Sequence, residues 1–336
     1  MSSRFRPLPL LDRLAPSDAH PLAGGPVLFT HVEDRESGDI CRLADLPNDI
    51  RAALTAPRAP LAGLSMDRPR VMGILNVTPD SFSDGGQHFS VRAAVARGRA
   101  MLAEGADILD IGGESTRPGA AEVPVAEEIA RVVPVIEALA AETRAPISID
   151  TRKARVAEAA LAAGATLVND VSAMSFDPEI AAVTAEAGAA LCLMHAQGTP
   201  ETMQEAPRYD DVLGEVADYL AERVSAAIDA GIAKDRVCVD PGIGFGKNLL
   251  HNLALLRGIA LYHGLGCPIL LGASRKRFIG TVSNVTEPGE RMPGSLGVAL
   301  AAAAQGVQIL RVHDVAETAQ ALRLWAAIGQ GESYGT

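Results

Sequence analysis

The chain contains little of several features that define other classes of protein. Aromatic residues make up only 4%, and 30 basic residues stand against 41 acidic ones. The resulting formal charge of −11 argues against holding nucleic acid or an anionic membrane by bulk attraction, since both need a positive surface. No apolar run approaches the roughly 18 residues of a membrane span. We therefore expect a soluble protein with no nucleic-acid and no membrane partner.

Cysteine is also scarce, with four residues in the chain. They form no C-x-x-C pair and show no zinc-type spacing with histidine. Three of them, Cys192, Cys238 and Cys267, lie in or beside apolar runs, where a reduced and buried thiol is the ordinary interpretation. The first residues are interrupted by Arg and Pro and hold no apolar segment of signal-peptide length. These features predict a reducing, cytoplasmic location.

A repeating pattern of short apolar runs and alanine-rich stretches begins at Val71 and continues to Ile328. Each run suits a strand buried on both faces, as in a parallel sheet. Eight such units favour a (β/α)8 TIM barrel, which takes ~250 residues, over an open doubly wound sheet. The expected strands are Val71–Leu75, Ile108–Ile111, Ile147–Ile149, Thr166–Val168, Ala190–Met194, Val237–Val239, Ile269–Leu271 and Gln308–Leu310. The expected helices cover roughly 91–104, 125–142, 153–163, 178–188, 210–230, 249–263, 294–306 and 314–328.

The first 66 residues differ from this pattern, because they are rich in Pro and carry no long helical period. Only Pro26–Val32 and the region Ile50–Leu54 look structured. We predict an N-terminal extension over residues 1–66, whose role the sequence does not assign. A single barrel domain over 67–330 would follow it.

Polar side chains follow every predicted strand, at the end where a barrel of this type has its active site. One group is cationic and suits a phosphorylated anion. It consists of Arg117, Lys276, Arg311 and His313. A second group suits a flat heterocycle with N–H donors and C=O acceptors. It consists of Asp150, Asn169 and Asp240.

Several of these side chains also have a purely structural interpretation. Asp150 could cap the helix that follows it, and Asn169 could be an amide satisfied at its strand end. The segment Arg275–Arg277 could be a solvated helix start, although a basic N-terminus opposes the helix dipole. His195 fits best a histidine that packs at the end of a strand.

Two glycine-containing segments resemble loops that approach ligands. Asp240–Lys247 (DPGIGFGK) ends in Gly-Lys, as a phosphate-binding P-loop does. It lacks the first glycine of that motif and the Ser or Thr after the lysine, so we reject that interpretation. Its glycines would instead let the backbone approach a flat ligand, with Phe245 available for stacking. The segment Asn76–Gly86, at the predicted barrel mouth, is a candidate lid.

Eight segments, in order and with no block missing, together resemble the dihydropteroate synthases. The resemblance covers about residues 70–328 and does not extend to the first 66 residues. The segments are ILNVTPDSFSDGG (74–86), DIGGESTRPGA (110–120), IDTRK (149–153), NDVS (169–172), MHAQGTPETMQ (194–204), DPGIGFGK (240–247), GASRKRFIG (272–280) and RVHDV (311–315).

This resemblance implies a folate-pathway transferase. Such an enzyme condenses 6-hydroxymethyl-7,8-dihydropterin pyrophosphate with p-aminobenzoate and releases 7,8-dihydropteroate and pyrophosphate. It also implies Mg2+ bound near Asn76 and a homodimer. Carried over residue by residue, the pterin pocket would consist of Asp150, Asn169, Val171, Met194, Asp240, Phe245, Gly272 and Lys276. The pyrophosphate and p-aminobenzoate side would consist of Asn76, Thr116, Arg117, Pro118, Ser274, Arg275, Arg311 and His313. The catalytic set would be Asp150, Lys276, Arg311 and His313.

Two other functions fit parts of the pattern. A pterin-binding methyltransferase would share the barrel and the acidic floor. It handles no pyrophosphate, so it would not need the S-T-R-P, S-R-K and R-V-H segments. A non-catalytic paralogue would be expected to lose Asp150, Lys276 or Arg311. All of these are present, which favours the synthase.

Overall fold

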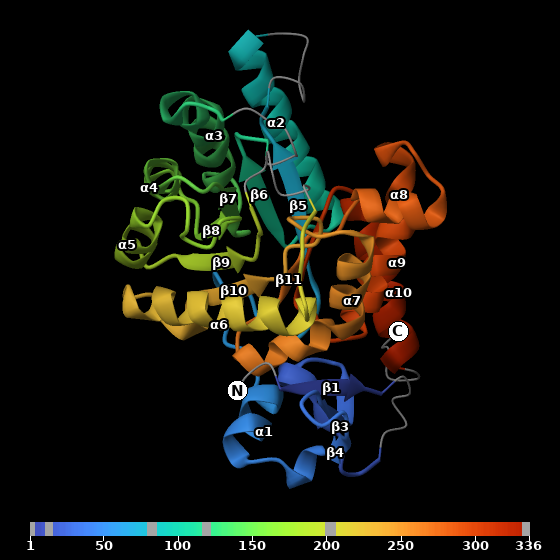
Figure 1. The fold of residues 1–336 in the computed structure, drawn as a ribbon. Helices are drawn as coiled ribbons and strands as arrows, with labels where there is room; N and C mark the ends of the chain where they lie inside the picture. Colours follow the sequence, from blue (N-terminus) through green and yellow to red (C-terminus); the bar gives the residue numbers. More distant parts are fainter. Residues whose placement is uncertain (1–3, 11–15, 79–85, 116–121, 199–205, 331–336) are drawn as a thin grey trace.

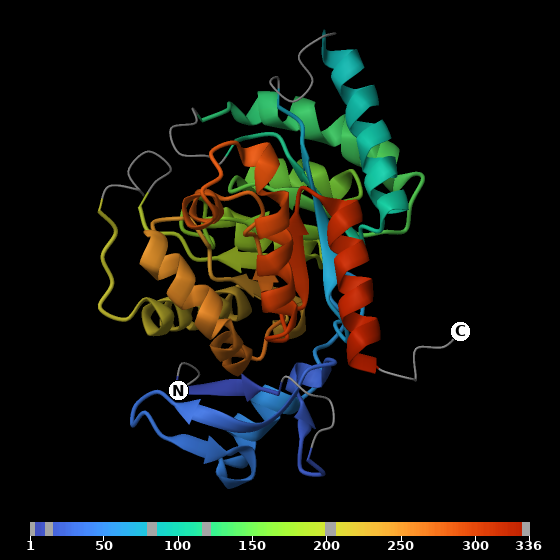
Figure 2. The same ribbon diagram turned by 90° about the vertical axis from the view of Figure 1, so that its right-hand side faces the viewer.

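The computed structural model describes residues 4–10, 16–78, 86–115, 122–198 and 206–330. Two units follow one another along the chain, a small antiparallel sheet and a larger parallel one (Figure 1). The small unit lies at the end of the barrel where the parallel strands begin, and the two views of Figures 1 and 2 agree on this. No helix in the described ranges is both long enough and apolar enough to cross a membrane.

The small unit is built around β3, which pairs antiparallel with each of the other three strands. Its elements are β1 (Phe5–Pro9), β2 (His20–Pro21), η1 (Leu22–Gly24), β3 (Leu28–Asp34), β4 (Ile40–Arg42), η2 (Leu43–Asp45) and α1 (Asn48–Thr55). Phe29 and Val32 of β3 are fully buried with Leu54 of α1, and Trp325 of the last helix packs against this cluster. The two segments expected to be structured correspond to β3 and α1.

The larger unit is the predicted TIM barrel, with eight parallel strands in the order β10-β9-β8-β7-β6-β5-β12-β11. A parallel bridge between Val239 and Ile269 joins the two ends of this order and closes the barrel. The strands are β5 (Arg70–Asn76), β6 (Ile108–Gly112), β7 (Ile147–Asp150), β8 (Leu167–Asp170), β9 (Ala190–Met194), β10 (Val237–Asp240), β11 (Leu270–Leu271) and β12 (Ile309–Val312). Each of the eight expected strands is found within a residue or two of its predicted position.

Helices surround the sheet in Figure 1, because the outward faces of the strands are apolar and need cover. They are α2 (Gly86–Glu104), α3 (Val125–Ala140), α4 (Ala154–Ala162), α5 (Glu179–Glu186), α6 (Val212–Asp229), α7 (Leu249–Gly258), α8 (Arg277–Ser283), α9 (Met292–Ala303) and α10 (Val315–Gln330). The described residues of the barrel also include the 3-10 segments η4 (Lys234–Arg236), η5 (Ile259–Leu265) and η6 (Pro288–Arg291). The periodicity did not predict α8, and it merged α7 with η5.

Alternation along the strands divides the barrel interior into two layers, since residues two apart point to the same side. The lower layer is apolar and includes Met72, Ile108 and Leu167. Leu61 and Met66, from the chain before β5, complete this layer from below. The positions two residues further along the strands are largely polar, as with Asp110 after Ile108. The apolar layer thus separates the small unit from a polar upper end.

Candidate active site

Arg311 of β12 lies at the centre of the polar upper layer. Its Nε donates to Asp110 Oδ2 at 2.5 Å, and its Nη2 donates to Asp150 Oδ2 at 2.6 Å. Asn169 also donates from Nδ2 to Asp110 Oδ2, at 3.2 Å. Four strands, β6, β7, β8 and β12, therefore meet in one hydrogen-bonded cluster of side chains. Charge-assisted bonds of this kind are the strongest that side chains make.

The two carboxylates of this cluster are not fully satisfied. Asp110 Oδ1 and Asp150 Oδ1 are buried and receive no hydrogen bond from the described part of the chain. Burial raises the pKa of Asp150 to about 7, against the lowering effect of Arg311, and the neighbouring Asp110 carboxylate adds to the rise. Buried polar atoms need partners, so these two oxygens can accept donors from a ligand.

Asp240 provides a third carboxylate, at the end of β10. Its Oδ1 accepts the N–H of Gly242 at 2.7 Å. Its Oδ2 points to the end of β11, because a Cβ atom added to Gly272 would lie 3.6 Å from that oxygen and 3.7 Å from Arg311 Cδ. Burial raises the pKa of Asp240 as well, while Lys276 opposes the rise. Gly272 therefore leaves open the space between this carboxylate and Arg311.

Lys276 lies beside the glycine-rich loop that follows β10. Its ammonium donates to the carbonyl of Ile243 and lies 4.5 Å from the centre of the Phe245 ring. Desolvation lowers the pKa of this lysine to about 8, and the carboxylates of Asp240 and Asp150 act against the fall. The ammonium and the aromatic ring together form one wall of the site.

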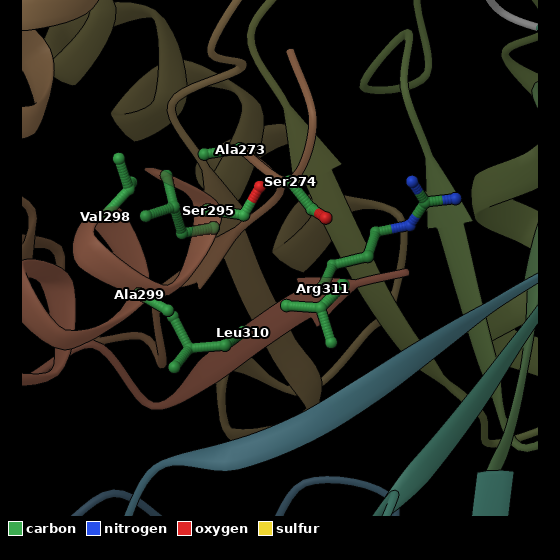
Figure 3. A pocket seen from close by; sticks show the side chains of 9 residues that line it. Ala273, Ser274, Ser295, Val298, Ala299, Leu310 and Arg311 are labelled. Carbon is green, nitrogen blue, oxygen red and sulfur yellow. The ribbon is translucent and has the colours of Figure 1, made fainter. Parts of the chain in front are cut away.

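The turn after β11 supplies a second polar group. Ser274 Oγ accepts the backbone N–H of His313 at 3.2 Å and lies 3.1 Å from Nδ1 of the same histidine. Arg275 pairs with Asp314 through two hydrogen bonds, one of them 3.0 Å from Nε to Oδ2. Figure 3 shows the small pocket behind this turn, where Ser274 and Ser295 line a mostly apolar wall and the Arg311 guanidinium extends away from it.

Asn76, at the end of β5, supplies an amide oxygen to the same cluster. A Cβ atom added to Gly112 would lie 3.4 Å from Asp150 Cβ and 3.8 Å from Asn76 Oδ1, so the two side chains flank that glycine. No three His, Cys, Asp or Glu side chains gather as a metal site within the described ranges. The Asn76 amide oxygen is an oxygen ligand of the kind that Mg2+ prefers.

Most of the predicted site residues lie in this one region. Val171 follows β8 and is half-buried, while Met194 ends β9 and is buried. Thr116, Arg117 and Pro118 lie outside the described residues, as does most of the candidate lid Asn76–Gly86. The residues that the structure brings together at the upper end are Asn76, Asp150, Asn169, Asp240, Phe245, Gly272, Ser274, Lys276, Arg311 and His313.

The structure also decides between the structural and functional interpretations of single residues. Asp150 does not cap α4, because the N–H of Ala154 donates to Asp177 instead. Arg275 is not a solvated cation, since its guanidinium pairs with Asp314. His195 is the packed histidine that the sequence favoured, 6% exposed and edge-on to the Tyr219 ring.

Two charged residues of this region were absent from the predicted set. Asp110 lies inside an apolar run rather than after it, and only its two-residue spacing from Ile108 showed that it points inward. Lys247 was dismissed together with the P-loop motif, yet its side chain is buried beside His195. The signal for Asp110 was a charged residue between Leu109 and Ile111, whereas the neighbours of Lys247, Gly246 and Asn248, gave no such signal.

Comparison with known proteins agrees with this geometry. A family model described as "Pterin binding enzyme" matches residues 72–313, a range that includes every described side chain of the site. The barrel and its polar upper end thus define the class, a pterin-binding enzyme.

Individual relatives narrow the class further. The chain is 52% identical over 261 residues to the dihydropteroate synthase of Escherichia coli (strain K12), covering 78% of this chain and 92% of that one. A Xanthomonas albilineans dihydropteroate synthase solved with 4-aminobenzoic acid has a TM-score of 0.76 and 52% identity, covering 82% and 98% of the two chains. The same enzyme solved with 7,8-dihydropteroate has a TM-score of 0.73 and 49% identity, covering 81% of this chain and 98% of that one. The chain belongs to the dihydropteroate synthase family, the folate-biosynthesis transferases that the sequence resembles.

Proposed function

We propose that this protein condenses 6-hydroxymethyl-7,8-dihydropterin pyrophosphate with p-aminobenzoate, forming 7,8-dihydropteroate and pyrophosphate. One observation carries the proposal, namely that Arg311 and Lys276 share one barrel end with Asp150, Asn169 and Asp240. Had the cations and the carboxylates lain at opposite ends of the barrel, no single ligand with a pterin ring and a diphosphate could have used both. Solved relatives with 4-aminobenzoic acid and 7,8-dihydropteroate support the two substrate types.

The pterin ring would occupy the floor of the site. Its N–H groups suit the unsatisfied carboxylate oxygens of Asp110 and Asp150, together with Asp240. Its C=O group suits the ammonium of Lys276, and its face suits the Phe245 ring. The ring would thus supply the donors that the buried carboxylates lack.

Breaking the C–O bond to pyrophosphate moves negative charge to the leaving group and positive charge to the pterin methylene carbon. The first charge is stabilised by Arg311, His313 and, from the segment outside the described residues, Arg117. The second is stabilised by the carboxylate of Asp150. The attacking aryl amine is a neutral nucleophile at pH 7, so the reaction needs no strong general base. Alignment of two substrates in one mouth supplies much of the remaining acceleration.

We further propose that Mg2+ is held at Asn76, with pyrophosphate oxygens and water as its other ligands. When bound, the ion supplies positive charge to the departing pyrophosphate. We also propose a homodimer, which the family resemblance supports, and a cytoplasmic location, which the free cysteines support. The four cysteines are free in the structure, as a reducing compartment requires.

A pyrophosphate-release assay tests the function directly. We expect release only when the pterin pyrophosphate, p-aminobenzoate and Mg2+ are all present, with dihydropteroate formed in equal amount. Omission of each component in turn is the control, and addition of EDTA should stop release. Release from the pterin substrate alone at the full rate would contradict the proposal, and so would activity that is indifferent to EDTA.

A further inference from the structure

The glycine-rich segment Asp240–Lys247 ends in a lysine that the reaction described above does not use. Unlike the lysine of a P-loop, Lys247 is turned into the protein and is only 2% exposed. Its Nζ lies 2.9 Å from His195 Nδ1 and donates to the carbonyl of Phe245 at 3.0 Å. A buried ammonium is costly unless its hydrogen bonds are satisfied, so these contacts fix the side chain in place.

His195 is the partner that makes this contact possible. Burial lowers the pKa of His195 to about 3, and the neighbouring Lys247 lowers it further in the same direction. The imidazole is therefore neutral at physiological pH, and its Nδ1 accepts a hydrogen bond from the Lys247 amino group. Burial lowers the pKa of Lys247 to about 7, against the raising effect of Asp240, and the amino group donates this bond in either protonation state. The rings of Tyr209 and Tyr219 lie 6.0 Å and 4.8 Å from the histidine ring and hold its orientation.

The loop between Asp240 and Lys247 packs against the end of β9 with no spare room. A Cβ atom at Gly242 would lie 1.9 Å from the carbonyl oxygen of His195, and one at Gly246 would lie 2.4 Å from that of Gln197. Both glycines have positive φ, +67° and +65°, which side-chain-bearing residues rarely adopt. The loop backbone thus packs directly against the residues that follow β9. The side chain of Lys247 contacts both, through His195 and through the carbonyl of Phe245.

Three further side chains hold the same loop. Asp240 accepts the N–H of Gly242 at 2.7 Å, Asn252 accepts that of Gly244 at 2.7 Å, and Tyr209 donates to the carbonyl of Gly246 at 2.9 Å. These bonds fix the two ends and the middle of the loop. The carbonyl of Phe245, at the tip, is the one that Lys247 holds.

The loop in turn sets the position of Lys276. The ammonium of Lys276 donates to the carbonyl of Ile243 and lies over the ring of Phe245. A Cβ atom at Gly244 would lie 3.4 Å from Lys276 Cδ, so the loop backbone and the Lys276 stem are in contact. A continuous chain of contacts therefore runs from His195 through Lys247 and the loop tip to Lys276.

We propose that Lys247 is a positioning residue for the pterin pocket. It holds the loop tip through the carbonyl of Phe245, with His195 as its second acceptor, and so fixes the Phe245 ring and the Lys276 ammonium where the pterin ring meets them. The proposal rests on the proposed function, since it assigns Lys276 and Phe245 to pterin binding.

The first test compares Lys247→Met with wild type, using 6-hydroxymethylpterin as the probe of pterin binding. Methionine keeps the length and the apolar stem but donates no hydrogen bond. We expect roughly 10- to 100-fold weaker binding of the probe and a similar rise in KM for the pterin pyrophosphate, because small displacements of contacting groups have effects of this size. The KM for p-aminobenzoate should change little. Lys234→Met, at an exposed lysine of η4, is the matched control.

A double-mutant cycle separates positioning from general stability. In a Lys276→Met background, Lys247→Met should weaken probe binding by much less than it does in wild type, because the group it positions is gone. If the double variant instead loses affinity by the product of the two single-variant losses, the proposal is contradicted. If the wild-type enzyme shows no activity, the proposed function itself is wrong. Failure of the proposed function can therefore be distinguished from failure of the positioning role of Lys247.

A second pair of variants keeps the proposal testable if Lys247→Met does not fold. His195→Asn retains an acceptor at the position of Nδ1, whereas His195→Leu removes it. We expect near-wild-type affinity for 6-hydroxymethylpterin in the first and a loss of roughly 10-fold or more in the second. Equal affinity in the two variants would overturn the role of the His195–Lys247 contact.

Discussion

At the scale of single residues, Asp110 and Asp150 are two buried carboxylates that share the guanidinium of Arg311. Burial raises the pKa of Asp150 to about 7, well above the ~3.9 of an exposed aspartate. When folding raises the pKa of a carboxyl group, the group stabilises the folded state most at a pH below its pKa in the unfolded chain. That contribution is lost as the pH rises through its folded pKa. Ionised Asp150 therefore opposes folding above about pH 7, although the reaction needs it in that form.

The substitution Asp150→Asn tests this conflict between stability and activity. Turnover should fall by about 100-fold or more, because the charge opposite the developing cation is lost. The melting temperature at pH 8 should not fall, since Asn carries no charge to desolvate and Asp110 still pairs with Arg311. Pyrophosphate release and thermal unfolding at pH 5 and pH 8 measure both effects. The stability of the variant relative to wild type should improve as the pH rises, and the opposite trend would contradict the argument.

At the scale of elements, the turn between β11 and α8 holds a backbone conformation that its own sequence does not favour. Arg275 has φ of +59°, which is uncommon outside Gly, Asn and Asp. Neighbouring elements impose this conformation. Ser295 of α9 accepts the Arg275 N–H at 2.9 Å, and Arg291 donates to the Arg275 carbonyl at 3.1 Å. The turn carries Ser274 and Lys276 into the site, so its conformation affects both.

Ser295→Ala should loosen this turn while leaving the carboxylate cluster intact. The Arg275 N–H loses its acceptor, at a cost of about 1–3 kcal/mol. We expect KM for p-aminobenzoate to rise several-fold, because Ser274 lies in this turn. KM for the pterin pyrophosphate should rise less, because the turn reaches the pterin pocket only through Lys276, whereas Asp110, Asp150 and Arg311 are held together by their own hydrogen bonds across the strands. Steady-state kinetics with each substrate varied in turn measures the difference. Ser283→Ala is the matched control, since Ser283 Oγ donates to the Ile279 carbonyl within its own helix. Equal changes in the two KM values would speak against this role for Ser295.

The sequence predicted elements better than it predicted contacts between them. The eight strands were visible because each is a continuous apolar run, and the polar residues after them converge because parallel strands end at one rim. The pairing of Arg275 with Asp314 was not visible, because 39 residues separate them and only the barrel geometry brings them together. Asp110 was missed for a related reason, since its inward direction depends on strand register. The helix α8 is too short for its periodicity to stand out.

At the scale of the whole molecule, the N-terminal unit and the barrel share their buried surface. Leu61 and Met66 complete the lower apolar layer of the barrel, and Trp325 of α10 packs against the cluster of the small unit. Arg35 pairs with Asp211 at the start of α6, and Arg58 donates to the carbonyl of His263. Apolar side chains from each unit are therefore buried against the other unit. For this reason we expect the two units to unfold together.

Leu61→Ala tests this coupling. Leu61 is 1% exposed, and removing a buried leucine side chain costs about 2–5 kcal/mol. We expect a lower melting temperature with one cooperative transition, followed by calorimetry and by the fluorescence of Trp325, the single tryptophan of the chain. The kcat at 25 °C should stay within about two-fold of wild type, because the apolar layer separates Leu61 from the site. Leu250→Ala, at a leucine that is 72% exposed on α7, is the matched control and should leave both quantities unchanged. Two separate transitions would show that the small unit and the barrel are not coupled as the packing indicates. A loss of kcat would show that the apolar layer does not separate Leu61 from the site.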